Sequence, residues 1–503
     1  MGTIYNKFET FPQDAHIGKG IIASNNSSTN ILNAALYIEK GNNFYLQGSY
    51  YCAIEAYKKA VIFNPNAYQA YTNMGNAFCE IGNLNTAIEF HNKAISLKPD
   101  YAIAYNSLGN VFYKQGKFKD AIDACKKSIS IKPDFAQAYN NIGNIQKYLG
   151  KIDISIKAFE KSVSLQPSNS LFQLDYSFAL LNKGFIKEGL DKYEWRWRTP
   201  KFLNQKRNFL QPKWDGKKSL NDKKILIWSE QGIGDTIKWS SVLPLVSSMA
   251  EFCILECQEK LVPLLKRSFP NIHVRAVDIS NDLKRTDFDF QLPMGSLYRF
   301  FLDDITKKPK PNFYLKADPD RISFWRDRLN SVGKGKYIGV NWKSANMEFS
   351  RQQNYASISE LSPVFSVPNA IFFNLQYKDF EDDLRKIYKE TGIKIHNFDD
   401  LDHYNNIDDV AAFCAALDVV VSTNNAVPYI SSGVGTVTKL VNWKQSPWNN
   451  ILHNPNVSTV NIFERDTDVS WQSVFNLISM DLSKLTKNRK FYESNNKNKT
   501  IKY

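Results

Sequence analysis

The sequence predicts an α-helical solenoid followed by an α/β module made of two similar halves. A 34-residue period marks the first part, where prolines stand at Pro65, Pro99, Pro133 and Pro167. Beyond residue 222, short β-rich runs alternate with helical stretches, which is typical of α/β folds. A Gly- and Lys-rich break, NSVGKGK at 330–336, separates the two halves of that second part.

Glycines follow the same period as the prolines. They form two sets, Gly41, Gly75, Gly109 and Gly143, and Gly48, Gly82, Gly116 and Gly150. Small residues let two helices approach closely, and each proline ends the second helix of a pair. Because one pair cannot bury its apolar face alone, the pairs are expected to stack. Four units are predicted over 34–169, and a degenerate fifth unit over 170–198 would cap the stack.

One of these units carries a resemblance to a known repeat. The segment AYTNMGNAFCEIGNLNTAIEFHNKAISLKPD, at 70–100, resembles the tetratricopeptide repeat almost position for position. The resemblance implies a helical solenoid with a concave groove. It is specific for the fold and says little about the ligand.

Asparagines also recur with this period, at Asn42, Asn76, Asn110 and Asn144. They share one position on the first helix of each unit, and in tetratricopeptide proteins that position lines the groove and contacts peptides. A side-chain amide donates and accepts at once, so a row of amides can hold an extended peptide with little demand on its sequence. O-GlcNAc transferases carry an asparagine ladder of this kind. The alternative is that Asn merely follows Gly on a helix surface in an Asn-rich chain.

The α/β region has strand-like runs in both halves. The first half has them near 225–229, 252–256, 272–276 and 288–292. The second half has them near 337–342, 371–375, 393–396, 418–422 and 437–442. Two such halves are expected to present the carboxyl ends of their strands to a shared cleft.

The first half contains an unusual glycine loop. The segment WSEQGIGDTIKW, at 228–239, is predicted to be a strand end, a glycine loop and a helix start. It matches neither the dinucleotide-binding fingerprint nor the phosphate-binding P-loop. It carries a single acid, Asp235, between the loop and the helix.

The second half contains a polar helix start after the strand at 418–422. Ser422, Thr423, Asn424 and Asn425 lie where free backbone N–H groups and the helix dipole would hold an anion such as a pyrophosphate. Gly433 would end the helix and permit close packing. Ordinary capping of the helix by these residues explains the same pattern equally well.

Several segments occur in an order that resembles a known module. The EQGIGD loop, IGVNWKS, FFNLQYKD, the helix and strand leading into STNNAVPYISSGVG, and KLVNWKQSPWNN follow one another over about 222–465. This order resembles the C-terminal module of bacterial tetratricopeptide glycosyltransferase-like proteins, akin to heptosyltransferases and more distantly to O-GlcNAc transferase. The resemblance implies a GT-B fold of two Rossmann-like halves. It also implies a nucleotide-sugar co-substrate bound mainly by the second half, with no metal and no other cofactor.

The resemblance assigns roles to residues of this chain. Asp235 would be the general base for the acceptor hydroxyl, with Gly232 and Gly234 bringing the backbone close to the sugar. Lys343 would offset the charge of the departing diphosphate. The remaining donor-binding candidates are Gln376, Tyr377, Ser422, Thr423, Asn424, Asn425 and Gly433. Asp409 is a candidate helix cap or ribose ligand.

The sequence departs from that family at the donor segment. Asn424 and Asn425 stand where the family has Asp and Thr, and Tyr429 stands where it has His, directly after Pro428. The carboxylate and the imidazole are therefore both missing. A changed donor or a loss of catalysis would each account for this.

Other chemistries find little support. The six cysteines form no C-x-x-C pair, so reduced, buried thiols in a cytoplasmic protein are expected. The net charge of +14 comes without a basic patch interleaved with aromatics, which argues against a nucleic-acid partner. No run is long enough to span a membrane. Asp287 and Asp289 form a D-x-D in a strand-like run without further metal ligands, and Trp195 and Trp197 favour packing over stacking on a nucleotide.

The expected domains are a disordered start at 1–30, the solenoid at 31–198, a connector at 199–221, the two halves at 222–330 and 336–480, and a basic tail at 481–503. The leading hypothesis is a cytoplasmic, bacterial-type glycosyltransferase whose repeats capture a protein acceptor, which on family grounds could be a flagellin-like surface protein. The rival hypothesis is an adaptor whose second module is a degenerate scaffold. A third, transfer to a lipopolysaccharide core, leaves the solenoid unexplained.

Overall fold

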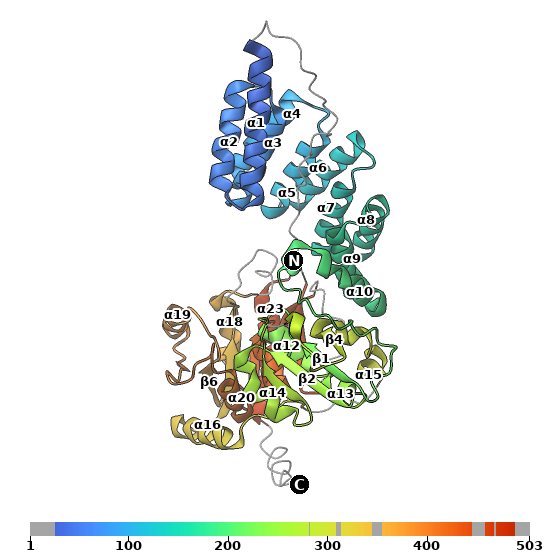
Figure 1. Ribbon diagram of the computed structural model, residues 1–503. Coiled ribbons are helices and arrows are strands. Elements are labelled where there is room, and N and C mark those ends of the chain that lie inside the picture. Colours follow the sequence, from blue (N-terminus) through green and yellow to red (C-terminus); the bar gives the residue numbers. More distant parts are fainter. Residues whose placement is uncertain are drawn as a thin grey trace. The chain divides into compact units, whose positions relative to one another are not determined.

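The structure is a computed structural model of the 503-residue chain. It describes residues 26–280, 282–307, 313–344, 355–444, 458–466 and 469–487. Contacts divide the chain into two units, Met1–Ala179 and Leu180–Tyr503, and the boundary falls inside helix α9. Figure 1 follows the chain through both units, from blue helices to red ones.

The first unit consists of antiparallel helix pairs. Its helices are α1 (Asn26–Leu46), α2 (Tyr50–Phe63), α3 (Tyr68–Glu80), α4 (Leu84–Leu97), α5 (Ala102–Lys114), α6 (Phe118–Ile131), α7 (Ala136–Tyr148), α8 (Ile152–Leu165) and α9 (Ser170–Lys183). A glycine with positive φ stands between the two helices of each pair, as at Gly82 (φ 84°) and Gly116 (φ 75°), where other residues would be strained. The 34-residue period is therefore a period of helix pairs, as the sequence predicted.

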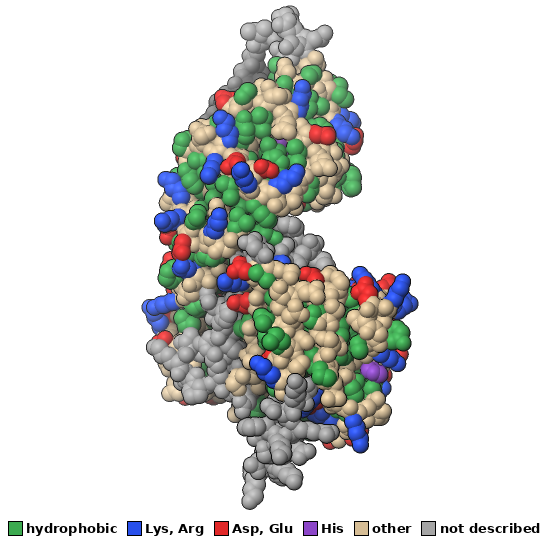
Figure 2. Space-filling model, turned by 180° about the vertical axis from the view of Figure 1, so that it is seen from behind, with side chains coloured by type: hydrophobic (Ala, Val, Ile, Leu, Met, Phe, Trp, Pro, Cys, Tyr) green, Lys and Arg blue, Asp and Glu red, His purple; other side chains and the backbone are tan. Residues whose placement is uncertain are grey.

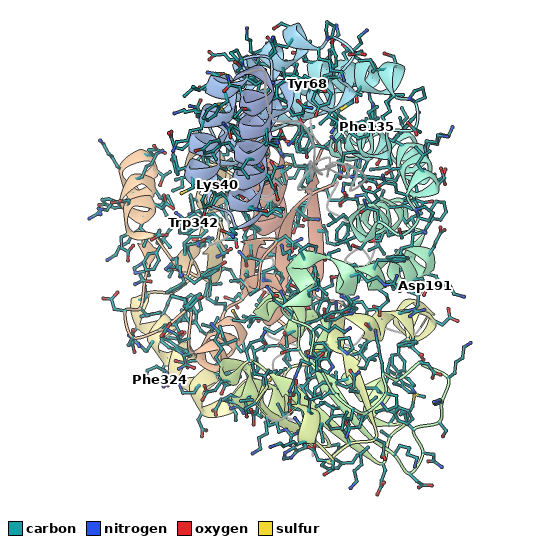
Figure 3. The ribbon with its side chains drawn as sticks, turned by 45° about the horizontal axis from the view of Figure 1, so that its top comes forward. Lys40, Tyr68, Phe135, Asp191, Phe324 and Trp342 are labelled. Carbon is teal, nitrogen blue, oxygen red and sulfur yellow. The ribbon has the colours of Figure 1, made fainter. Side chains whose placement is uncertain are left out.

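The pairs stack through small residues and aromatic rings. Ala94 of one pair packs with Tyr101 and Ala104 of the next, and all three are buried. Tyr68, labelled in Figure 3, meets the ring of Tyr101 edge-on at a centroid distance of 4.7 Å. The contact joins consecutive units, because Tyr68 begins α3 and Tyr101 precedes α5. Neighbouring pairs thus bury the apolar surface that one pair would leave exposed.

The second unit begins with short helices and a four-stranded sheet. Its elements are α10 (Ile186–Tyr193), η1 (Glu194–Arg198), α11 (Pro200–Leu203), β1 (Lys224–Trp228), α12 (Ile233–Ser240), α13 (Leu243–Ser247), β2 (Phe252–Cys257), η2 (Glu259–Leu261), α14 (Val262–Ser268), β3 (His273–Ala276), η3 (Asp282–Lys284), β4 (Phe290–Pro293), η4 (Met294–Arg299) and α15 (Leu302–Lys307). The strands are parallel in the order β3-β2-β1-β4.

A six-stranded sheet follows in the same unit. Its elements are α16 (Pro319–Val332), β5 (Lys336–Asn341), α18 (Ile358–Phe365), β6 (Ala370–Asn374), α19 (Glu381–Thr391), β7 (Ile395–His396), α20 (Ile407–Ala416), β8 (Val419–Thr423), α21 (Val427–Gly433), β9 (Val437–Trp443), β10 (Val460–Arg465) and α23 (Trp471–Lys487). The strands are parallel in the order β10-β9-β8-β5-β6-β7. In both sheets the first strand along the chain lies inside, and the strand order reverses beside it, as in doubly wound Rossmann-like sheets.

Helices cover both faces of the six-stranded sheet. On one face, Phe365 of α18 and Phe475 of α23 are buried with Val340 of β5 in a common apolar cluster. On the other face, Trp325 of α16 packs edge-on against Phe413 of α20. Buried faces on both sides explain why these strands read as nearly continuous apolar runs in the sequence.

Each of the nine predicted strands agrees with an observed strand to within two residues at both ends. Strand β10 was not predicted. Its residues, VNIFER, are half-buried or exposed at the edge of the sheet, so the segment lacks the apolar run that marks the central strands.

Three predicted boundaries differ from the structure. Helix α1 begins at Asn26, inside the start at 1–30 that was expected to be disordered, and residues 1–25 lie outside the described residues. The predicted end of the solenoid at 198 falls in the second unit, because contacts assign Leu180 onward to that unit. Helix α23 runs to Lys487, so the tail expected at 481–503 begins as helix, and residues 488–503 lie outside the described residues.

Charged side chains of both signs mix on the face of the molecule that Figure 2 draws. The chain carries a net charge of +14, and Figure 2 shows its Lys and Arg side chains interspersed with Asp and Glu on the face drawn there. Within the described ranges, no helix combines the length and the apolar character that crossing a membrane requires.

Candidate functional site

A buried polar cluster lies at the carboxyl ends of β5 and β8. Asn341, the last residue of β5, accepts hydrogen bonds through Oδ1 from Ser422 Oγ (3.3 Å), Thr423 Oγ1 (3.4 Å) and the side-chain amide of Asn425. The strand order of the sheet reverses between β5 and β8, which is where doubly wound sheets hold ligands. Three predicted donor-binding residues are thus brought together. Sequence reasoning missed their common partner, although a polar residue ending a buried strand was a usable signal.

Gln376 joins this cluster from the end of β6. Its Oε1 accepts from Asn341 Nδ2 (3.1 Å) and from the backbone N–H groups of Trp342 (3.4 Å) and Lys343 (3.1 Å). Backbone N–H groups only donate, so these contacts fix which end of the amide is oxygen. The Nε2 group is left buried without a hydrogen-bond partner among the residues that the structure describes. A buried donor of this kind costs about 1–3 kcal/mol until an acceptor pairs with it.

Lys343 and Tyr377 are engaged elsewhere. Lys343 Nζ forms an ion pair with Asp383 Oδ2 at 2.6 Å and donates to the carbonyl of Asp379 at 2.7 Å. Asp383 also accepts from the indole of Trp342, which is labelled in Figure 3. Tyr377 donates its hydroxyl to Ser344 Oγ at 3.1 Å. Lys343 would have to exchange Asp383 for a diphosphate to play the predicted role.

The start of α21 differs from the predicted anion site. The N–H of Val427 donates to Asn425 Oδ1 at 2.9 Å, and Pro428, in the second position of the helix, has no N–H. Asn424 is paired at both ends, since its Nδ2 donates to Asn442 at 3.0 Å and its Oδ1 accepts from Tyr429 OH at 3.0 Å. The N–H of Val427 is therefore occupied and Pro428 offers none, so neither position of the first turn can donate to a phosphate. The polar residues here form a closed turn of the Asx type.

Asp235 lies in the first turn of α12 and is half-buried. A Cβ built on the neighbouring Gly234 would be 3.1 Å from Cα of Ala426, the residue before α21. Because Gly234 has no side chain, α12 can approach the backbone of Ala426. The sequence analysis had expected this glycine to bring the backbone close to a sugar instead. Burial, followed by the charge of Asp235, raises the pKa of Tyr429. Asp235 and the 424–429 segment therefore face one another.

The segment at 314–315 contacts both α12 and α21. The backbone N–H groups of Tyr314 and Leu315 both donate to the carbonyl of Gly433 at 2.9 Å. The hydroxyl of Tyr314 donates to the carbonyl of Ile237 at 3.0 Å. A Cβ on Gly433 would be 2.6 Å from Leu315 Cδ1, so any larger residue there would have to displace the buried Leu315 side chain. The predicted role of Gly433 in close packing fits this arrangement.

Lys238 was not singled out from the sequence. It is buried one turn after Asp235 on the same helix. Burial lowers its pKa to about 8, while the charge of Asp235 acts in the opposite direction. Lys238 follows Asp235 by three residues, which places both on one face of a helix, and this spacing could have identified Lys238 from the sequence.

Two weaker candidates, Asp409 and Asp287, take structural roles. Asp409 accepts from Arg321 Nε (2.7 Å) and from the indole of Trp325 (2.8 Å), so it is neither the cap of α20, which is Asn406, nor exposed to a ribose. Asp287 of the D-x-D pairs with Arg275 at 2.6 Å. Over the described ranges, no group of three His, Cys, Asp or Glu side chains is placed to hold a metal ion.

Of the four periodic asparagines of the repeats, Asn42 and Asn144 bond across junctions between units. Asn42 is half-buried and accepts from Tyr57 OH and from Asn73 of the next unit, both at 2.9 Å. Asn76, Asn110 and Asn144 are buried. Sequence reasoning did not foresee that amides of this row bridge consecutive first helices.

At the last junction an acid sets the orientation of the amides. Asp175 Oδ2 accepts from Asn140 Nδ2 at 2.9 Å and from Asn144 Nδ2 at 3.0 Å. An ionised carboxylate only accepts, so both nitrogens face Asp175 and both oxygens face away from it. The Oδ1 atoms of Asn110, Asn140 and Asn144 are buried and have no hydrogen-bond partner within the described part of the chain.

Comparisons with known proteins identify the repeats of the first unit. One family model described as "TPR repeat" matches residues 41–80 and 75–116, and two models described as "Tetratricopeptide repeat" match 102–135 and 136–169. Protein FlbA of Caulobacter vibrioides is 30% identical over 285 residues, which cover 53% of this chain and 47% of FlbA. The chain thus spans about half the length of this curated relative.

Solved structures are similar over about a third of the chain. A crystal structure of MamA is 27% identical and covers 33% of this chain and 97% of MamA, with a TM-score of 0.27. A thermophilic TPR protein of Thermus thermophilus is 20% identical and covers 34% of this chain and 94% of its own, with a TM-score of 0.32. Together with the helix pairs and their period, the matching family models establish that residues 41–169 are tetratricopeptide repeats.

Proposed function

We propose that this chain binds an extended segment of another protein in its repeats, and that its second unit transfers a sugar to that segment from a nucleotide-sugar. The first step fits the repeat family, whose members present a groove to proteins. The buried oxygens of Asn110, Asn140 and Asn144, which have no partner in the described part of the chain, add support, because backbone N–H groups of an extended segment would pair with them.

The Nε2 of Gln376, which has no hydrogen-bond partner among the residues that the structure describes, carries the second step. It is a buried donor at the carboxyl end of β6, beside the reversal of strand order that serves as the ligand site in doubly wound sheets. An acceptor oxygen of a nucleotide would relieve the cost of that orphan donor. Two Rossmann-like sheets in one unit also fit a GT-B glycosyltransferase, which is the fold that the sequence resemblance implies.

Asp235 is the proposed general base. In the reaction, the acceptor hydroxyl oxygen forms a bond to the anomeric carbon, the bond from that carbon to the diphosphate breaks, and the hydroxyl proton passes to the Asp235 carboxylate. Lys343, released from Asp383, would pair with the departing diphosphate. Glycosylation of a side-chain hydroxyl in the captured segment, as in a flagellin-like surface protein, is the form of the reaction that uses both units.

A second candidate function is a protein-binding adaptor. The closed start of α21 favours it, because Val427 N–H is already paired and Pro428 has none. The contact between Gly234 and Ala426 also fills the point where a sugar was expected. In this candidate the second unit is a scaffold that binds no nucleotide-sugar.

Titration calorimetry on the full chain separates the two functions. UDP-, GDP-, ADP- and CMP-sugars and the free nucleotides are the probes. We expect one nucleotide class to bind, and an Asp235→Asn variant to keep that affinity while its transfer rate falls by about 100-fold or more. Glu251→Gln, an exposed carboxylate of the same half, is the control and should leave both unchanged. Binding of none of these compounds would favour the adaptor.

A further inference from the structure

Arg196 is a fully buried guanidinium at the carboxyl ends of β1 and β4. It belongs to η1, and its Nε and Nη2 donate to the two carboxylate oxygens of Glu230 at 3.0 Å and 2.6 Å. Neither side chain is exposed to solvent. Its Nη2 also donates to Ser296 Oγ, in η4, at 3.1 Å. A planar guanidinium held at three points fixes its partners in both distance and angle.

Glu230 connects this arginine to both strands. It follows β1 by two residues, and its Oε1 also accepts from the backbone N–H of Gly295, just after β4, at 3.0 Å. A Cβ on Gly295 would be 2.5 Å from that oxygen, so glycine alone fits here. The strand order of the first sheet reverses between β1 and β4. The Arg196–Glu230 pair therefore fills the crevice in which a doubly wound sheet otherwise holds a ligand.

Side-chain hydrogen bonds also hold the residues that lie between Glu230 and α12. Gln231 has a φ of +65°, which residues other than glycine rarely adopt. Its Nε2 donates to Tyr193 OH at 2.7 Å, and its carbonyl accepts from Gln258 Nε2 at 3.2 Å. Gly232 then precedes α12, whose first turn carries Asp235. The path of the chain into that turn is fixed by α10, η1 and the end of β1.

A second ion pair attaches the same segment to η4. Asp191 of α10, labelled in Figure 3, pairs with Arg299 of η4. Both side chains are more than a third exposed, unlike the Arg196–Glu230 pair. This contrast supplies a matched control, because the two arginines bind neighbouring elements at very different burial.

The charges around Arg196 balance. Arg196 also pairs with Glu194 at 2.6 Å, and Glu194 pairs with Lys213. Two cations therefore face the two carboxylates of Glu194 and Glu230. A neutral cluster exerts little net field on Asp235, so its effect on that residue is geometric.

We propose that Arg196 is a positioning residue for Asp235: through Glu230 and Gln231 it fixes the first turn of α12 at the place where the acid meets the acceptor hydroxyl. The inference rests on the proposed function, in which Asp235 is the base. It assigns a role in that site to Arg196, which lies between Trp195 and Trp197, a pair for which the sequence favoured packing over stacking on a nucleotide.

The test compares Arg196→Lys with Arg299→Lys in the full chain. Lysine keeps the charge at 196 and loses the fork that holds both carboxylate oxygens. We expect Arg196→Lys to lower kcat for sugar transfer at least tenfold, with the KM for the nucleotide-sugar and the acidic limb of the pH–rate profile unchanged. Arg299→Lys should change kcat less than twofold.

Hydrogen exchange gives a readout that does not depend on activity. The amides of 231–236 should exchange at least tenfold faster in Arg196→Lys, while those of β5 and β8 keep their rates. A double variant, Arg196→Gln with Glu230→Gln, replaces the ion pair by a neutral amide pair, which guards against simple failure to fold, and it should restore part of the protection.

The outcomes separate the two proposals. Unchanged exchange at 231–236 in Arg196→Lys would overturn the positioning role, whatever the activity. Unchanged kcat despite faster exchange would overturn it as well. If the wild-type chain transfers no sugar at all, the proposed function fails, and faster exchange at 231–236 would then show that Arg196 orders this loop without any part in catalysis.

Discussion

Gly234 lies directly against the backbone of Ala426. A Cβ at Gly234 would be 3.1 Å from Cα of Ala426 and 3.4 Å from its nitrogen. The two residues follow strands of different sheets in the second unit: Gly234 lies in α12, after β1, and Ala426 precedes α21, after β8. This contact sets how closely the acid-bearing turn approaches the polar segment at 424–429.

Gly234→Ala should therefore weaken the packing of α12 on α21. The neighbouring atoms are backbone and cannot rotate away, so we expect the free energy of unfolding to fall by about 1–3 kcal/mol. Urea denaturation of the full chain measures it. Gly232→Ala is the control, because its Cβ would meet only Asp235 Oδ2, at 3.8 Å. Equal losses in the two variants would contradict the close-approach explanation.

His91 should make the stability of the repeats depend on pH. It is fully buried on α4, both ring nitrogens lack a hydrogen-bond partner in the described part of the chain, and burial lowers its pKa from 6.5 to about 3. The unfolded chain therefore binds more protons than the folded chain between pH 3 and 6.5. The free energy of unfolding should rise with pH through that window, by up to about 1.4 kcal/mol per unit from this residue, and level off above it.

His91→Phe tests this origin. Phe159 occupies the equivalent place two units later and packs against Gly143 as His91 packs against Gly75. The variant should lose this pH slope in urea titrations at pH 4, 5, 6 and 7, and gain about 1–2 kcal/mol at pH 7 because two unpaired nitrogens are removed. His273→Phe, at an exposed position, should keep the slope. A slope that survives in His91→Phe would assign the effect to other groups.

Asp175 should stabilise the last junction of the repeats by accepting two amides. Asp175→Leu leaves the Nδ2 groups of Asn140 and Asn144 buried without their acceptor, which should cost about 2–5 kcal/mol. Asp175→Asn keeps an acceptor oxygen and should cost less than about 1 kcal/mol. Thermal unfolding followed by circular dichroism compares the two. Similar losses would mean that the volume at 175, and not its oxygen, holds the junction.

The ion pair of Arg267 with Asp408 should stabilise the contact between the two sheet-bearing halves of the second unit. Arg267 lies on α14 and donates to both carboxylate oxygens of Asp408, on α20, at 2.7 Å and 2.8 Å. Arg267→Lys keeps the charge and loses the paired geometry, so we expect a loss of about 0.5–1.5 kcal/mol in urea denaturation. Arg385→Lys is the control, because its pair with Asp382 is exposed and should contribute almost nothing. Equal effects would contradict a role of geometry at Arg267.

Much of the fold could be read from local patterns. The period of Pro65 and Pro99, the glycines that end each first helix, and the apolar runs of the central strands are short-range signals, and the structure confirms the elements they predict. The site was only partly predictable. The sequence marked Asp235 and the 422–425 segment, but it could not show that Asn341 gathers Ser422, Thr423 and Asn425, since those residues are about eighty positions away.

By itself, the sequence determined the repeat architecture and the alternation of strands and helices, because these follow from the conformational preferences and periodic burial of neighbouring residues. Only the tertiary structure decided what the polar residues do. It paired Arg196 with Glu230, turned the side-chain amides of Asn140 and Asn144 toward Asp175, and occupied the N–H of Val427. The physical reason is that the role of a buried polar side chain depends on the group to which it is hydrogen-bonded or ion-paired. Which group that is depends on how segments distant in the sequence pack together.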